Sequence, residues 1–314
     1  MLILQRMISH DILLSELFAD MEKNLNYLRS LLFIPGNQAK MLGKAAGLTP
    51  DAFIPDLEDS VAPDDKDEAR EIVSDHIDVL SGNGVRVLPR VNSLDTGLLE
   101  ADLEAVIGPN IFGITVGKIQ LPEHIEEISS LISRFENSAG LKDGSLKLIP
   151  WIESALGVVK AYDILTASPR IYGAAFGAED FTNDMGIERT DDDSEILHAT
   201  NAIAIAARAA NVIALDTPFV SFRDEEGLVN DANESKSIGY KGKFAIHPAQ
   251  ITPINTCFSP SPKEIDYATR VLEVFEEAKA QGRGSTSLDG QMIDVPVVKR
   301  AEGLLAMAKS MNLT

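Results

Sequence analysis

Cysteine is nearly absent from this chain, whose 314 residues contain only Cys257. A single thiol excludes an internal disulfide and any metal site built from several thiolates. Histidine is also scarce, with five residues, and none of them falls in an HExxH pattern or in another paired spacing typical of zinc enzymes. We therefore expect the chemistry to depend on other side chains. The lone cysteine is also in keeping with a reducing, cytoplasmic location.

The chain also lacks long apolar runs, and it has few positively charged residues relative to its acidic ones. No segment approaches the ~18 consecutive apolar residues of a membrane span, and residues 1–27 are too polar for a signal-peptide core, so we expect amphipathic helical turns there. Lysine and arginine number 28 against 48 acidic residues, which gives a net charge of −20. Because like charges repel, this balance argues against nucleic acid or an acidic membrane as partner. An anionic ligand would need a local basic cluster.

Apolar segments rich in β-branched residues recur along the chain at a steady spacing. Runs without polar alternation are typical of strands buried on both faces, and helical stretches such as 63–80 and 194–212 lie between them. We predict eight strands, at residues 28–35, 52–59, 85–92, 113–121, 146–154, 171–180, 212–219 and 242–248. Eight βα units predict a (β/α)₈ TIM barrel over residues 28–255. An open doubly wound sheet is the alternative, but no GxGxxG motif follows the first strand.

Residues 256–314 are expected to form a C-terminal helical segment. Ser261 and Pro262 are a helix start signal, a Gly/Ser-rich stretch follows, and a second helix is expected from Pro296. The segment is too short for an independent core, so we expect it to pack on its own barrel or on that of a neighbouring subunit.

Two carboxylates stand where consecutive strands are predicted to end. Glu153 closes the fifth strand and Asp180 the sixth, and barrel enzymes place catalytic groups at these ends. Two carboxylate oxygens, completed by water and substrate, suit Mg²⁺, which keeps part of its hydration shell. The alternative is that each residue caps a helix or pairs with a lysine.

Arg90 ends the third predicted strand, and a buried guanidinium must have an anion nearby. That anion is either a substrate group or one of the acids that end the second strand, Asp56, Glu58 and Asp59. A strand extending to Asp59 would place Asp56 and Glu58 on one face and Asp59 on the other. Both explanations of Arg90 remain open at this point.

Basic residues gather just past the first strand. Lys40 and Lys44 are one helical turn apart, and with Arg29 they form a candidate cluster for nucleotide phosphates. The alternative is that both lysines are simply solvated. His247, at the end of the eighth strand, is expected to be a structural histidine rather than a ligand contact.

Eight motifs together resemble the citrate lyase β-subunit family, part of the HpcH/HpaI aldolase superfamily, which includes malyl-CoA and citramalyl-CoA lyases. In chain order they are RSLLFIPGN, DLEDSVAPDDK, RVNSLDTG, WIESALG, FGAEDF, DTPF, GKFAIHPAQ and GQMIDVPVVKRAE. The resemblance covers the chain from Arg29 to the last helix. It implies a TIM barrel and a Mg²⁺-dependent carbon–carbon lyase that acts on an acyl-CoA thioester.

The resemblance also implies roles for single residues. Glu153 and Asp180 would hold Mg²⁺, and Arg90 would bind the thioester carbonyl. Asp294 would be the catalytic acid/base, reaching the active site of a neighbouring subunit in a homo-oligomer, a trimer or hexamer.

Contacts with coenzyme A are implied in the same way for Phe33, Lys40 and Lys44. Gln38 departs from the family pattern, because relatives often have an arginine there, near the phosphates. The phosphates of coenzyme A would then be bound more weakly, or other residues would bind them.

The run Met292–Pro296 looks most like the stand-alone citramalyl-CoA and malyl-CoA enzymes. The expected reaction is therefore the cleavage of (3S)-citramalyl-CoA to acetyl-CoA and pyruvate. Malyl-CoA and citryl thioesters, the latter cleaved by citrate lyase β subunits, are alternative substrates. A malyl-CoA thioesterase or a non-catalytic CoA-binding subunit is the alternative of a different class.

Overall fold

The computed structural model describes residues 27–190 and 193–314. The predicted helical turns of residues 1–27 lie outside the described residues, Tyr27 apart. The chain divides into two compact units, and the division falls between Phe258 and Ser259. Among the described residues, no helix combines the length and the apolar character needed to cross a bilayer.

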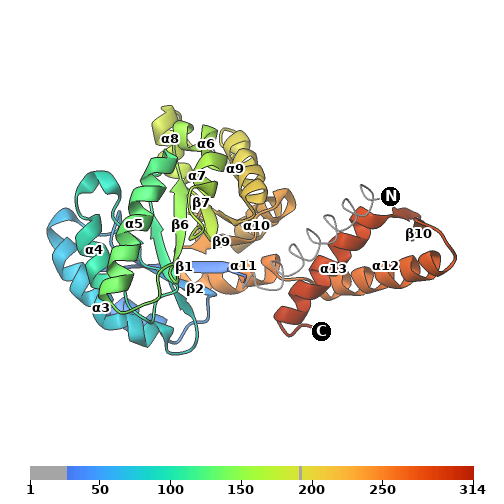
Figure 1. Ribbon diagram of the computed structural model, residues 1–314, viewed down its shortest axis with the longest axis horizontal. Helices are drawn as coiled ribbons and strands as arrows, with labels where there is room; N and C mark the ends of the chain where they lie inside the picture. Colours follow the sequence, from blue (N-terminus) through green and yellow to red (C-terminus); the bar gives the residue numbers. More distant parts are fainter. Residues whose placement is uncertain (1–26, 191–192) are drawn as a thin grey trace, which may run out of the picture. The chain divides into compact units, whose positions relative to one another are not determined.

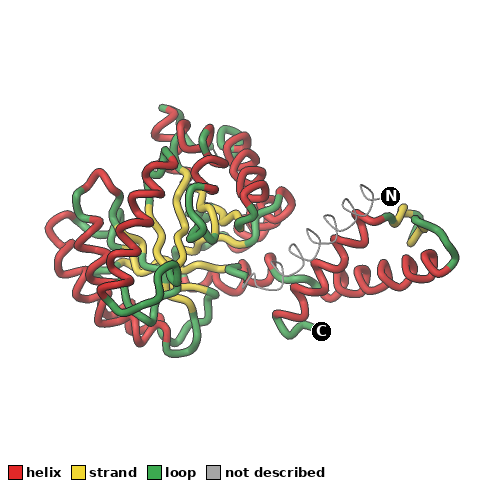
Figure 2. Tube along the Cα trace, viewed as in Figure 1, coloured by secondary structure: helices red, strands yellow, loops and turns green. Residues whose placement is uncertain are grey.

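A closed parallel sheet forms the centre of the first unit (Figures 1 and 2). β1 pairs with both β2 and β9, and this double pairing closes the barrel. β3 and β4 both pair with β2 and form the two halves of one interrupted barrel strand, because Pro89 between them has no N–H to donate. The strands are β1 (Ser30–Pro35), β2 (Ala52–Asp56), β3 (Arg86–Val87), β4 (Arg90–Val91), β5 (Gly113–Val116), β6 (Lys147–Ile152), β7 (Gly173–Phe176), β8 (Ile213–Asp216) and β9 (Gly242–Ala245). The predicted eight-stranded TIM barrel is confirmed.

Helices surround this sheet, as the red coils around the yellow strands of Figure 2 show. They bury apolar residues at helical spacing, such as Ala69, Val73, Ile77 and Leu80 on α3, against the outer faces of the strands. The helices are α2 (Ala39–Ala45), α3 (Lys66–Ser81), α4 (Leu99–Val106), α5 (Pro122–Ser138), α6 (Ala155–Val159), α7 (Ala161–Thr166), α8 (Ala178–Met185), α9 (Leu197–Ala210), α10 (Glu225–Ile238) and α11 (Ile251–Phe258), with short 3₁₀ turns η1 (Pro63–Asp65), η2 (Leu94–Thr96) and η3 (Pro248–Gln250).

Several strands end earlier than predicted, such as β5, which stops at Val116 rather than at residue 121, and two of these corrections change where acidic residues lie. β2 stops at Asp56 rather than at residue 59, and β7 stops at Phe176 rather than at residue 180. Glu179 and Asp180 lie in the first turn of α8, where the unpaired N–H groups of a helix favour carboxylates. Asp180 therefore reaches the barrel mouth from a helix and not from a strand.

The second unit, Ser259–Thr314, contains two helices that pack on each other, α12 (Pro262–Ala280) and α13 (Val295–Ser310), shown in orange and red in Figure 1. Ser261 and Glu264 form a capping box, which explains the start of α12. The unit has a small apolar cluster of its own, contrary to expectation, made of Ala268, Val271, Ile293, Val298 and Ala301.

A β-hairpin inside the Gly/Ser-rich stretch was not predicted. Its strands are β10 (Thr286–Leu288) and β11 (Gln291–Ile293). Asp289 and Gly290 form the turn with φ of 52° and 78°. Asp-Gly is a preferred pair for such left-handed hairpin turns, so the signal was present in the sequence.

Candidate active site

Aromatic rings form the floor of the barrel mouth. Phe33 on β1 lies 5.4 Å from Phe244 and 5.7 Å from Trp151 between ring centroids. Trp151 is held by a 2.7 Å hydrogen bond that its Nε1 donates to Oγ1 of Thr115. The Arg90 guanidinium carbon lies 4.8 Å above the Phe33 ring, within cation–π range.

Arg90 binds the acids that follow β2, so an ion pair of the kind considered from the sequence is present. Its Nε and Nη2 donate to the two oxygens of Asp56 at 2.6 and 2.7 Å, and Nη1 lies 3.2 Å from Glu58 and 3.1 Å from Asp59. All three acids converge on one side, so the predicted alternation of faces is wrong, because β2 ends before Glu58. Burial opposes the charge of Asp56, but the hydrogen bonds from Arg90 outweigh it and lower the pKa of that carboxyl.

Two buried side chains hold the loop after β2 in place: Lys66, which was not predicted to lie at the site, and Asn92, which ends the third predicted strand. Nζ of Lys66 donates to the carbonyl oxygens of Leu57 and Glu58 at 2.6 and 2.7 Å. Nδ2 of Asn92 donates to the Leu57 carbonyl at 2.9 Å. Lys66 ends the DLEDSVAPDDK motif, which was the available signal. These contacts fix the acids against Arg90.

Glu153 follows β6 and is almost completely buried, with 6% of its surface exposed. Its carboxylate fits against two glycines: a Cβ on Gly117 would lie 2.9 Å from Oε1, and a Cβ on Gly177 would lie 2.3 Å from Oε2. The backbone N–H of Lys118 donates to Oε1. Burial and the charge of Asp180 raise the pKa of Glu153 to about 8.

Asp180 is half-buried, and its pKa is raised by burial and by the nearby charge of Asp59. Nζ of Lys118 lies 3.2 Å from Glu58 and 3.8 Å from Asp59, and its charge lowers the pKa of Asp180 too little to offset burial and Asp59. Both raised pKa values indicate too little positive charge near these two carboxylates, which a divalent cation would supply.

The donor set fits Mg²⁺ rather than zinc. In residues 27–190 and 193–314, no three or more His, Cys, Asp or Glu side chains form a metal-holding group. Two carboxylates with open positions for water and substrate oxygens are the arrangement that Mg²⁺ commonly has in enzymes. Glu153 and Asp180 are thus the residues here that could hold it.

We predict that Gly177→Ala weakens Mg²⁺ affinity about tenfold or more, because overpacking of this kind costs ~1–3 kcal/mol. The added methyl group would displace Oε2 of Glu153. Gly108→Ala is the matched control, since a Cβ there meets nothing within 4 Å. Mg²⁺ titrations of both variants check the prediction, and equal affinities would contradict it.

The predicted basic cluster is only partly assembled. Lys40 and Lys44 are exposed on α2, just past the carboxyl end of β1. Arg29 does not belong with them, because it binds Asp51 at 2.7–2.8 Å at the opposite, amino-terminal end of β1 and β2. Gln38 is exposed and donates to Asn37 at 3.3 Å.

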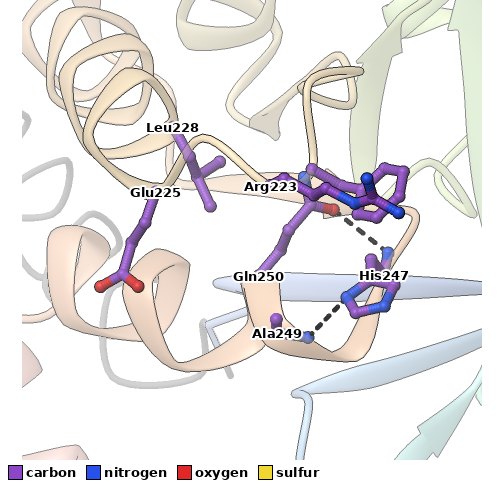
Figure 3. A pocket seen from close by; sticks show the side chains of 7 residues that line it. Arg223, Glu225, Leu228, His247, Ala249 and Gln250 are labelled. Carbon is purple, nitrogen blue, oxygen red and sulfur yellow. Dashed lines mark hydrogen bonds between the residues drawn. The ribbon is translucent and has the colours of Figure 1, made fainter.

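His247 has a structural role at the carboxyl end of β9 (Figure 3). Its Nδ1 accepts a 3.2 Å hydrogen bond from the N–H of Ala249 and so caps η3. Its ring stacks on Phe222 at 4.9 Å. A cavity of about 380 Å³ lies beside it, lined by Phe222, Arg223, Glu225, Leu228, His247, Ala249 and Gln250.

Asp294 lies in the second unit, where it caps α13. One oxygen accepts a 3.3 Å hydrogen bond from the N–H of Val297, and the side chain is half-buried. Its apolar neighbours Met292 and Val295 are 67% and 51% exposed. The cap explains why the carboxylate is held in one orientation while it remains accessible.

Comparison with known proteins gives consistent matches over nearly the whole chain. The family described as HpcH/HpaI aldolase/citrate lyase matches residues 29–248. Citrate lyase subunit beta of Leuconostoc mesenteroides subsp. cremoris is 38% identical over 285 residues, 91% of this chain and 94% of the relative. Mitochondrial citramalyl-CoA lyase of Rattus norvegicus is 31% identical over 294 residues, 90% of this chain and 87% of the relative.

A solved structure extends the likeness to three dimensions. The protein CitE from Mycobacterium tuberculosis, in complex with magnesium, acetoacetate and coenzyme A, superposes with a TM-score of 0.75 at 27% identity. The match covers 90% of this chain and 99% of that one.

Proposed function

We propose that this chain, which belongs to the HpcH/HpaI aldolase/citrate lyase family and is a lyase, cleaves the carbon–carbon bond of a 3-hydroxyacyl-CoA thioester. The observation that carries the proposal is the meeting of Glu153, Asp180 and Arg90 at one barrel mouth. The proposed substrate is (3S)-citramalyl-CoA, which would give acetyl-CoA and pyruvate, and the Met292–Pro296 run supports it. A citryl thioester is the second candidate, supported by the higher identity to a citrate lyase subunit.

Glu153 and Asp180 are the proposed holders of Mg²⁺, supported by the magnesium in the related CitE structure. Bound Mg²⁺ would polarise the substrate hydroxyl and its neighbouring carboxylate, lowering the cost of the alkoxide. Glu153 suits this task because Gly117, Gly177 and the N–H of Lys118 hold its carboxylate in one position.

Arg90 has the proposed role of stabilising the thioester oxygen. When the Asp294 carboxylate of a neighbouring copy takes the hydroxyl proton and the carbon–carbon bond breaks, the alkoxide becomes the carbonyl of the 2-oxo acid, and the bonding electron pair moves to the thioester and forms an enolate. Asp56 and the Phe33 ring hold the guanidinium in place, so it need not reorganise as this charge develops. Asp294 of a neighbouring copy would then protonate the enolate carbon.

Arg90→Lys is expected to lower kcat by about 100-fold or more, with a smaller change in KM, because lysine keeps the charge but loses the planar donor array. Steady-state kinetics together with thermal unfolding checks this. If the variant were destabilised but fully active per folded molecule, Arg90 would be only a structural ion pair.

Coenzyme A is the proposed partner of Phe33, Lys40 and Lys44. Both lysines are exposed on α2, at the same end of the barrel as Arg90, which supports this proposal. The Phe33 ring, being below Arg90, would contact the thioester end rather than the nucleotide.

Kinetics on purified citramalyl-, malyl- and citryl-CoA tests the proposal. A lyase releases acetyl-CoA and a 2-oxo acid in equal amounts. A thioesterase instead releases free coenzyme A and the hydroxy acid, and a non-catalytic subunit releases nothing. Either of the last two outcomes would contradict the proposed reaction.

A further inference from the structure

Lys118, two residues past the end of β5, has a left-handed backbone with φ of 60°. Glycine adopts this conformation freely, whereas other L-residues are strained in it. The preceding Gly117 is required for space, because a Cβ there would lie 2.9 Å from oxygens of both Glu58 and Glu153. The strained position nevertheless carries a lysine, which points to a task for its side chain.

The backbone of Lys118 does not account for that task. Its N–H donates to Oε1 of Glu153, and any residue other than proline would supply the same N–H. Glycine at this position would hold Glu153 equally well and without strain. The reason for lysine must therefore lie in its ammonium group.

That ammonium has donor capacity left. Nζ donates to Glu58 at 3.2 Å and lies 3.8 Å from Asp59, and an ammonium has three donors. The two carboxylates of Glu58 and Asp59 beside it favour the charged ammonium. The side chain is 41% exposed, against 13% for Arg90, whose donors are occupied by three carboxylates.

The surroundings indicate which kind of anion Lys118 would meet. The backbone N–H of Lys118 donates to Glu153, so the residue borders a carboxylate that is proposed to hold Mg²⁺. A substrate carboxylate arriving there would be repelled by Glu58 and Asp59 unless a cation stood between them.

We infer that Lys118 binds the carboxylate of the 2-oxo acid half of the substrate, the one attached to the hydroxyl-bearing carbon. This inference rests on the proposed function and extends it. It makes Lys118 a determinant of specificity that selects thioesters with this carboxylate over the corresponding esters or amides.

Lys118→Gly isolates the ammonium, because it retains the N–H to Glu153 and relieves the backbone strain. Binding of pyruvate, of methyl pyruvate and of Mg²⁺ alone is measured by calorimetry, with the 2-oxo compounds added to the Mg²⁺-loaded full-length protein. Pyruvate should bind about tenfold more weakly or worse, as expected for a lost charge-assisted hydrogen bond. Methyl pyruvate and Mg²⁺ should bind as in the wild type, and KM for the thioester should rise more than kcat falls.

Two further variants serve as controls. Lys118→Arg should recover most of the pyruvate affinity. Asn211→Gly, at another left-handed residue with φ of 60° at the end of α9, should change none of the three affinities.

Unchanged pyruvate binding in Lys118→Gly would overturn the inference and leave the proposed function standing. Equal losses for pyruvate, methyl pyruvate and Mg²⁺ would also overturn it, because they would show that Lys118 acts through Glu153. Wild-type protein that binds no 2-oxo acid would overturn the proposed function as well.

Discussion

Glu153→Gln and Asp180→Asn are each expected to abolish activity, with a loss of about 1,000-fold or more, while the barrel stays folded. Each substitution removes one of the two carboxylates proposed to hold Mg²⁺, and metal-supported charge stabilisation contributes several kcal/mol to such reactions. Activity assays with added Mg²⁺ or Mn²⁺, and with excess chelator, check this. Full activity of the wild type in chelator would contradict the metal proposal.

The pH dependence of metal binding gives the same prediction a second readout. Without metal, Glu153 has a pKa of about 8, so at pH 7 it is mostly protonated and must release a proton when Mg²⁺ binds. Mg²⁺ affinity should therefore rise about tenfold per pH unit up to pH 8 and then level off. In Glu153→Gln this rise should be reduced, because that proton is absent.

The stability of the metal-free protein should fall as pH rises, whereas Mg²⁺ affinity should increase. The pKa of Glu153 is raised by folding from 4.5, so its contribution to stability is fully present below pH 4.5 and is lost as pH rises through about 8. Mg²⁺ should restore the melting temperature at pH 8. A melting temperature that rises across this range without metal would contradict the assignment.

Mixing two inactive variants, Asp294→Ala and Glu153→Ala, is expected to restore activity when subunits exchange. We propose that the C-terminal unit serves the active site of a neighbouring copy. A site with an intact barrel from one variant and an intact tail from the other would then be complete. Random mixing of equal amounts should complete about a quarter of the sites. Activity is measured after a cycle of dissociation and reassociation, with exchange followed by a label on each variant.

Exposed apolar residues around Asp294 support this arrangement. Met292 and Val295 flank Asp294 and are exposed, whereas Val298 belongs to the unit's own cluster and Leu304 packs against that cluster. Met292→Ser should therefore weaken assembly, while Arg283→Ser, at an exposed residue of the same unit, should not. Mixtures that stay inactive despite demonstrated exchange would place Asp294 in its own subunit's site or outside any site.

The sequence alone was sufficient for the barrel, because burial on both faces of parallel strands leaves unbroken apolar runs that can be counted. It also located the charged residues at the barrel mouth, since polar side chains that end such runs cannot be core. The start of α12 was predicted correctly, because the Ser261 capping box is a local feature. Each of these inferences depends on residues that are close together in the sequence.

Only the tertiary structure decided how the charges are arranged. An apolar run does not reveal where the hydrogen bonding between strands stops, so the ends of β2 and β7 were placed too late. For the same reason Asp180 was assigned to a strand, although it lies on α8. Arg90 meets Asp56 because β4 pairs with β2, a contact across 34 positions in the chain. The burial of Lys66 and the left-handed backbone of Lys118 were unforeseen for the same reason. Their partners are set by how the sheet closes and how the loops turn, and no periodic pattern encodes those distances.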